Sequence, residues 1–203
     1  MSLIKLTKEG VEKMMLLRGN VRGNIVKAHF DYILETQGPG GLKKVEKRLA
    51  ELGYPIKASE ADSRKWYPEA ISCLIVLGSA EIFNMDEKGV FKSAYEASKY
   101  SFIVRFLMKY VLSPKKVIKE IPNYWKKSFD FSEMEVVDFN ENEKYATILI
   151  KGFQKYHPLI CEYHRGYFTK IAEITFSSKK VKVQHTNCLF WKDPYEEFKI
   201  TWE

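Results

Sequence analysis

The chain has 203 residues, of which 45% are hydrophobic and 14% aromatic, and this composition excludes a disordered chain. Its formal net charge of +7 comes mainly from lysines spread over many segments, so nucleic-acid binding is not expected. The sequence contains neither an apolar run of about 18 residues nor a secretory signal pattern, and we therefore predict a cytoplasmic protein without a membrane span.

The first quarter of the chain is predicted to be helical. Thr7 is placed to cap a short helix within residues 3–18, and apolar residues then recur at helical spacing over residues 21–36 and 42–52. The segment Gly38-Pro39-Gly40-Gly41 separates these last two stretches. We therefore expect two helices that fold back on each other across a glycine hinge.

The middle of the chain predicts three further helices. Trp66-Tyr67-Pro68 leads into an apolar, mostly buried helix over residues 70–77. Aromatic residues at nearly every turn predict a helix that starts at Phe91 and continues to Val111. Ser113-Pro114 then starts another helix, which Pro122 is expected to disturb.

The last third predicts a sheet with one inserted helix. Residues 134–137 and 145–150 read as a strand pair, helical spacing runs from Pro158 to Ile174, and residues 180–185 and 198–202 alternate as the arms of a hairpin. On its alternation with Phe198 and Ile200, Trp202 is expected on the core side of the sheet, against a helix.

These elements predict an α+β fold, in which N-terminal helices pack on a four-stranded antiparallel sheet with the C-terminal order β-β-α-β-β. We expect one ligand-binding-like domain over residues 1–203, helical over 1–130 and sheet-forming over 131–203. The interior apolar cleft between the aromatic helices and the sheet is the expected ligand site. Its candidate residues are Trp66, Tyr67, Tyr95, Phe102, Phe106 and Trp125.

A spaced set of residues in the last third matches a known pattern. The matching positions are Cys161, Gly166, Val183, His185, Thr186, Cys188, Asp193, Phe198 and Trp202. Together with Arg22-Gly23 and Trp66-Tyr67-Pro68, they resemble an uncharacterised bacterial family related to the 4-vinyl reductase domain, a small-molecule-binding module. The chain departs from the family at Lys192, where glycine is usual, and at Glu196, where a second cysteine is frequent.

The 4-vinyl reductase domain is similar in fold to haem domains that sense nitric oxide and to Golgi transport complex subunits that hold an acyl chain. The haem branch uses a helical histidine and a Tyr-x-Ser-x-Arg string. The nearest string here runs from Tyr95 through Ser98 to Tyr100 without the arginine, and no histidine lies between Phe30 and Tyr156. Haem is therefore not expected.

Thiol and imidazole groups gather in the last third of the sequence. Three cysteines without an export signal argue against a disulfide framework. Cys161 and His164 share one side of a helix, and His185 and Cys188 lie near the end of a strand. These ligand types suit tetrahedral zinc, so a zinc site of these four residues is one hypothesis. In the alternative, the cysteines are small buried hydrophobes and the histidines lie at the surface.

Phosphate-binding glycine motifs and a Gly-x-Ser-x-Gly elbow are missing from the sequence, and no catalytic residue is proposed. The first interpretation is a non-enzymatic module that binds an apolar small molecule as a ligand-binding or sensor unit in signalling. The alternative is a metal-binding protein or an enzyme that uses the Cys161, His164, His185 and Cys188 cluster. Because Met14, Met15 and Leu16 crowd a short helix, we also expect a homodimer through the N-terminal helices.

Overall fold

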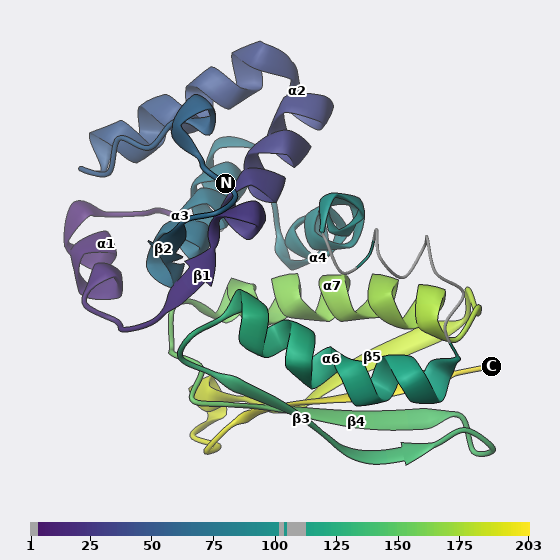
Figure 1. Ribbon diagram of the computed structural model, residues 1–203. Helices are drawn as coiled ribbons and strands as arrows, with labels where there is room; N and C mark the ends of the chain where they lie inside the picture. Colours follow the sequence, from purple (N-terminus) through teal and green to yellow (C-terminus); the bar gives the residue numbers. More distant parts are fainter. Residues whose placement is uncertain (1–3, 102–103, 105–112) are drawn as a thin grey trace.

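The computed structural model describes residues 4–101, 104 and 113–203 of the chain, and its architecture is α+β as predicted (Figure 1). In chain order the elements are α1 (Lys8–Met15), β1 (Asn20–Arg22), α2 (Gly23–Glu51), η1 (Ala58–Glu60), β2 (Trp66–Pro68), α3 (Glu69–Ile82), α4 (Glu87–Ala97), η2 (Ser98–Tyr100), α6 (Pro114–Ser128), β3 (Glu133–Asn140), β4 (Tyr145–Lys151), α7 (Pro158–Thr175), β5 (Val181–Asn187), η3 (Leu189–Trp191) and β6 (Glu196–Trp202).

The four long strands form one antiparallel sheet in the order β3-β4-β6-β5. The two predicted strand pairs, β3 with β4 and β5 with β6, are confirmed, and β4 joins them by pairing with β6. Phe198 stands opposite both Ile148 and His185. Its side chain is fully buried, and β6 is one of the two inner strands of the sheet, beside β4.

Two helices cover one face of this sheet (Figure 1). α7 packs on β5 and α6 on β3, while α4 lies on the side of α7 that faces away from the sheet. The contact between α4 and α7 depends on Gly166, because a Cβ atom there would lie 2.2 Å from the carbonyl oxygen of Phe91. α7 therefore contacts the sheet on one side and the remaining helices on the other.

The N-terminal helices are held by local signals that the sequence shows. Thr7 caps α1, since its Oγ1 accepts a hydrogen bond from the Gly10 N–H at 3.1 Å. The expected hinge lies within α2, where Gly38 has a φ of 66° and separates two helical arms. The short pair of β1 and β2 was not expected, because three-residue strands are too short to show a period of two.

Two expected boundaries differ in the structure. The aromatic helix starting near Phe91 belongs to α4, which ends at Ala97; the expected continuation to Val111 falls largely outside the described residues. Pro122 lies inside α6, which nevertheless continues to Ser128. Packing offsets the missing hydrogen bond, because the buried rings of Trp125 and Phe129 stack with centroids 4.1 Å apart beyond the proline.

Trp202 lies on the helix side of the sheet, as its phase predicted. Its ring stacks on Phe176 at the end of α7, with centroids 3.5 Å apart and planes at 3°. None of the described helices is long and apolar enough to cross a membrane.

Candidate functional site

One cavity, called the large cavity below, lies among α2, α3, α6 and α7, on the side of α7 away from the sheet. It has a volume of ≈ 80 Å³, several times the roughly 10–15 Å³ that a single water needs. Most of its wall is apolar or aromatic, but the side chains of His29, Glu69, Cys73 and His164 also line it. The cavity is therefore a small amphipathic compartment rather than a packing defect between aliphatic residues.

His29 on α2 is fixed by two partners. Its Nε2 lies 2.9 Å from Ser72 Oγ on α3, and its Nδ1 lies 3.1 Å from the hydroxyl of Tyr163 on α7. Burial lowers the pKa of His29 to about 4, so the ring is neutral near pH 7. This network ties three helices together at the cavity wall.

Glu69, the first residue of α3, is the unusual group of this wall. It is 4% exposed, and its Oε1 accepts a hydrogen bond from the Cys73 thiol at 3.6 Å. Its Oε2 is buried and has no partner within 3.5 Å among the described residues, although the neighbouring Ser72 hydroxyl is close enough to lower the pKa of the carboxyl somewhat. Burial raises the pKa of Glu69 to about 8. A buried carboxyl with one oxygen unsatisfied is costly, and such a group in a cavity marks a candidate binding site.

His164 on α7 lies on the same wall, surrounded by aromatic rings. Its ring centroid is 4.8 Å from that of Phe153 and 6.1 Å from that of Trp125, both edge-on. Burial lowers its pKa to about 4. His164 thus presents a neutral imidazole to the cavity near pH 7.

A second, smaller cavity of ≈ 40 Å³ lies between α6, α7 and the sheet. Its wall is almost wholly apolar, with residues such as Ile118, Phe168 and Ile200. Trp125 and Tyr167 line both cavities. This position corresponds to the apolar cleft that the sequence analysis expected between the helices and the sheet.

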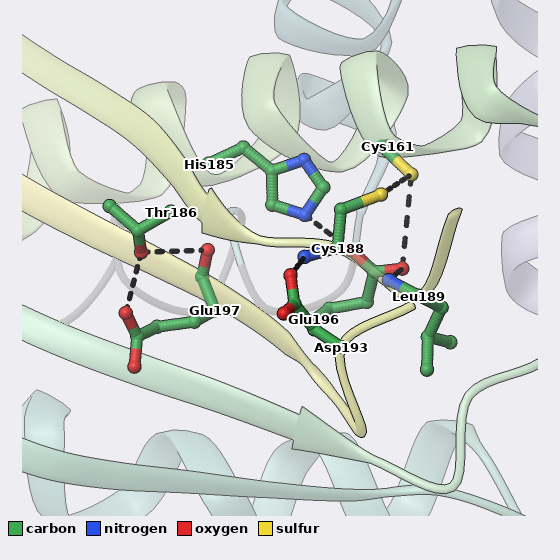
Figure 2. A network of polar contacts seen from close by, with 8 residues as sticks. All are labelled: Cys161, His185, Thr186, Cys188, Leu189, Asp193, Glu196 and Glu197. Atoms are coloured by element: carbon green, nitrogen blue, oxygen red, sulfur yellow. Dashed lines mark hydrogen bonds and ion pairs between the residues drawn. The ribbon is translucent and has the colours of Figure 1, made fainter. Parts of the chain in front are cut away.

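The sulfur, imidazole and carboxylate groups on the sheet side of α7 form a separate cluster. Cys161 on α7, His185 on β5, Cys188 just beyond β5 and Glu196 at the start of β6 each offer one ligand atom, and these atoms lie within 4.8 Å of one another. Figure 2 shows the two thiols and the carboxylate pointing toward a common point between helix and hairpin. The four side chains are 2–9% exposed.

The distance between the two sulfurs of this cluster is close to that in a tetrahedral metal site. Cys161 Sγ and Cys188 Sγ are 3.9 Å apart, and Cys161 Sγ is 3.9 Å from Glu196 Oε1. Two sulfurs that each lie about 2.3 Å from one zinc ion at the tetrahedral angle are about 3.8 Å apart. A disulfide needs about 2.05 Å between its sulfurs, so this pair is reduced. The two thiols are therefore spaced as ligands of one ion.

A further set of hydrogen bonds fixes the hairpin end of the cluster (Figure 2). The backbone N–H of Cys188 donates to Asp193 Oδ2 at 2.8 Å, and that of Leu189 donates to Glu196 Oε1 at 3.2 Å. Glu196 Oε2 is hydrogen-bonded to His185 Nε2. Such supporting bonds orient ligands before an ion arrives.

The electrostatics of the cluster also favour a cation. Burial raises the pKa of the Cys161 thiol well above its usual range, and the nearby Glu196 carboxylate and Cys188 raise it further. Two thiols and a carboxylate thus lie close together in one buried place. A divalent ion would reverse this effect by deprotonating the thiols that bind it.

The structure brings together three of the four residues in the zinc hypothesis. His164 points instead to the large cavity, and Glu196 takes the fourth place. Sequence reasoning did not include Glu196, although a signal existed. The signal was the departure noted in the sequence analysis, where the resemblance led us to expect a second cysteine at position 196 and the chain has glutamate.

The predicted ligand-binding residues lie in different places. Trp125 lines both cavities. Trp66 is 42% exposed and its ring lies beneath the guanidinium of Arg22, at 4.6 Å, while the Tyr67 hydroxyl accepts a hydrogen bond from the Asp62 N–H at 2.9 Å. Neither lines the two cavities described above.

Three further candidates remain. Tyr95 donates a hydrogen bond to Glu173 on α7 at 2.5 Å. Phe102 and Phe106 lie outside the described residues.

Comparison with known proteins identifies the fold. No family model matches the sequence, and no curated protein matches it. Solved structures do match, and those described below are distant in sequence, with 10–16% identity. The H-NOX protein from S. oneidensis in the Fe(II)NO ligation state has a TM-score of 0.63 and 16% identity, over 90% of this chain and 99% of that one.

Two other neighbours agree with this match. The Fe(II) unliganded H-NOX protein from K. algicida has a TM-score of 0.60 and 12% identity, over 90% of this chain and 96% of its own. An oxygen-binding H-NOX domain related to soluble guanylate cyclases gives 0.59 and 10%, over 90% and 95%. The fold is therefore that of H-NOX domains, a ligand-binding fold.

This result corrects the sequence-based expectation about haem. One neighbour carries Fe(II)NO, and another was studied for the modulation of haem redox potential by porphyrin distortion, so the neighbours of this fold bind haem and the expectation against haem was wrong. In the present chain, His164 offers a neutral imidazole of the kind that binds haem iron. No lysine or arginine among the described cavity residues is available to pair with propionates.

Proposed function

We propose that this chain is a non-enzymatic sensor module that binds a small molecule in the cavity among α2, α3, α6 and α7. The observation that carries the proposal is the unsatisfied, buried Glu69 Oε2 at the wall of that cavity, because natural interiors rarely leave such an atom without a partner. The H-NOX neighbours, which include an oxygen-binding domain, support a sensing role by analogy of fold.

The test is to look for a ligand retained by the purified protein and to block its site. Native mass spectrometry of the freshly purified chain should show a mass above that of the polypeptide, and the absorbance spectrum reports haem through its Soret band. Val76→Phe adds an aromatic ring at the cavity wall and should abolish the added mass. Val137→Phe is the matched control, because Val137 is 50% exposed on β3. Retention of the same mass by Val76→Phe would contradict this location.

As a second function, we propose that the chain binds one zinc ion, which joins α7 to the β5–β6 hairpin. The ligands would be Cys161, His185, Cys188 and Glu196. The convergence of four buried ligand atoms within 4.8 Å supports this proposal. With four protein ligands the site has no open position for a substrate, which is typical of a structural rather than a catalytic zinc. When bound, the ion would cross-link α7 to the β5–β6 hairpin.

Elemental analysis tests the zinc proposal. The parent protein should contain about one zinc per chain, and Cys188→Ser should contain much less. Cys73→Ser is the matched control, since Cys73 is also a buried free thiol but lines the large cavity, away from the proposed zinc ligands. Equal zinc in Cys188→Ser and the parent would rule out this site.

A further inference from the structure

The wall of the large cavity carries an acid that has no basic partner. Apart from Glu69, the described residues that line it have neutral or apolar side chains near pH 7, and none is lysine or arginine. Buried carboxylates in proteins are ordinarily paired with a cation or hydrogen-bonded at both oxygens. Here Oε1 has the Cys73 thiol and Oε2 has no described partner.

The remaining wall suits an organic cation. The rings of Trp125, Phe129, Tyr163 and Tyr167 line the cavity, and aromatic faces attract ammonium groups. An anion would meet the Glu69 carboxyl without any compensating positive charge, and a purely apolar molecule would leave Oε2 unsatisfied.

We infer that the cavity binds a small primary amine, whose ammonium group donates to Glu69 Oε2 and whose alkyl part packs against the rings of Trp125 and Phe129. This inference rests on the proposed small-molecule-binding function and names its ligand class. The volume of ≈ 80 Å³ restricts the bound part to a few heavy atoms.

The protonation states around Glu69 give this ligand class a distinct pH signature. The titratable groups that face the cavity or Glu69 are His29 on α2, Cys73 on α3, Tyr156 before α7, and Tyr163, His164 and Tyr167 on α7. Burial keeps both histidines neutral by lowering their pKa to about 4, and it raises the pKa of the thiol and of the tyrosines. Among these cavity groups, Glu69 is therefore the one that changes charge near pH 8.

Amine binding requires the carboxylate, so affinity should rise with pH up to about 8 and level off until the amine itself loses its proton, at about pH 10. A neutral ligand that accepts a hydrogen bond from the protonated acid should show the opposite trend. The direction of the pH dependence thus separates the two ligand classes.

The experiment uses three four-carbon probes, n-butylamine, 1-butanol and butyrate, titrated into the full chain. The reporter is the indole N–H resonance of Trp125, assigned by Trp125→Phe, because this group lies at the cavity and donates to Ser132 Oγ at 3.0 Å. At pH 8.5 butylamine should bind at least about tenfold more tightly than butanol, and butyrate least.

Two variants complete the test. Glu69→Gln keeps the hydrogen-bonding shape without the charge, and should weaken butylamine by about tenfold or more while leaving butanol within about twofold. Glu12→Gln, on the exposed face of α1, is the matched control and should change neither. Butanol binding that equals butylamine binding, or butylamine binding that Glu69→Gln leaves intact, overturns the amine inference and leaves the cavity proposal standing. Failure of all three probes to bind, with no retained ligand in the purified protein, overturns both.

Discussion

The two sides of α7 carry buried polar groups in different states. On the sheet side, Cys161, His185, Cys188 and Glu196 converge within 4.8 Å, and further hydrogen bonds hold them. On the opposite side, Glu69 borders a cavity of ≈ 80 Å³ with one carboxyl oxygen unpaired. The contrast teaches that converging ligand atoms leave room for an ion, whereas an unpaired atom beside a cavity leaves room for a molecule.

The largest expected effect comes from removing the proposed zinc ion on the sheet side of α7. Because binding free energy at a structural zinc site is also folding free energy, a strong chelator should lower the free energy of unfolding by about 5 kcal/mol or more, or the melting temperature by about 10–20 °C. Thermal denaturation with and without chelator measures this. Cys188→Ser should melt low in both conditions, and a parent protein indifferent to the chelator would remove the distinction between the two sides.

The next effect concerns Glu69 in the absence of ligand. Its pKa is raised from 4.5 to about 8 by burial, so between these values the folded chain holds a proton that the unfolded chain has lost. The Glu69 contribution to stability should therefore fall as pH rises from 4.5 to 8, by up to about 4 kcal/mol, and stay level above that. Urea denaturation of the parent and of Glu69→Gln at pH 5 and 8 measures this contribution as the difference in pH dependence between the two proteins, since His29 and His164 titrate alike in both. An unchanged slope in Glu69→Gln would assign the dependence to other groups.

A smaller effect tests whether His164 lines the large cavity or binds the proposed zinc ion on the sheet side of α7. Burial lowers its pKa from 6.5 to about 4, so the unfolded chain binds a proton there before the folded chain does. The His164 contribution to stability should fall as pH falls from 6.5 to 4, and His164→Phe should remove this loss of about 3 kcal/mol. The zinc content should stay at the parental value in His164→Phe and drop in His185→Ala. Loss of zinc in both variants would return His164 to the metal site.

The smallest expected effect on stability comes from a substitution that tests the predicted homodimer. Leu16 is 82% exposed on the C-terminal side of α1, and we predict that it contributes to a homodimer contact. Leu16→Glu should halve the mass seen by light scattering and change the free energy of unfolding of each chain by no more than about 0.5 kcal/mol. A parent protein that is already monomeric at tens of micromolar would refute the dimer.

Much of this architecture could be predicted from the sequence. The period of two around Val183 and Phe198 predicted the closing hairpin, and Thr7 and Pro158 marked helix starts that the structure confirms. These features depend on residues within a few positions of each other, so local pattern determines them. The pairing of Cys161 with the His185–Cys188 segment was also within reach, because thiol and imidazole groups are few in this chain.

The other features were decided by tertiary structure. Glu69 reads in the sequence as an ordinary acid at a helix start, and its burial appears only when α2, α6 and α7 enclose it. Likewise, His29 meets Tyr163 across 134 positions, and Glu196 replaces His164 only because β6 pairs with β5 beneath α7. Sequence periodicity specifies which face of an element is buried, but the partners on that face, and so the pKa values and the unpaired atoms, depend on packing between distant segments.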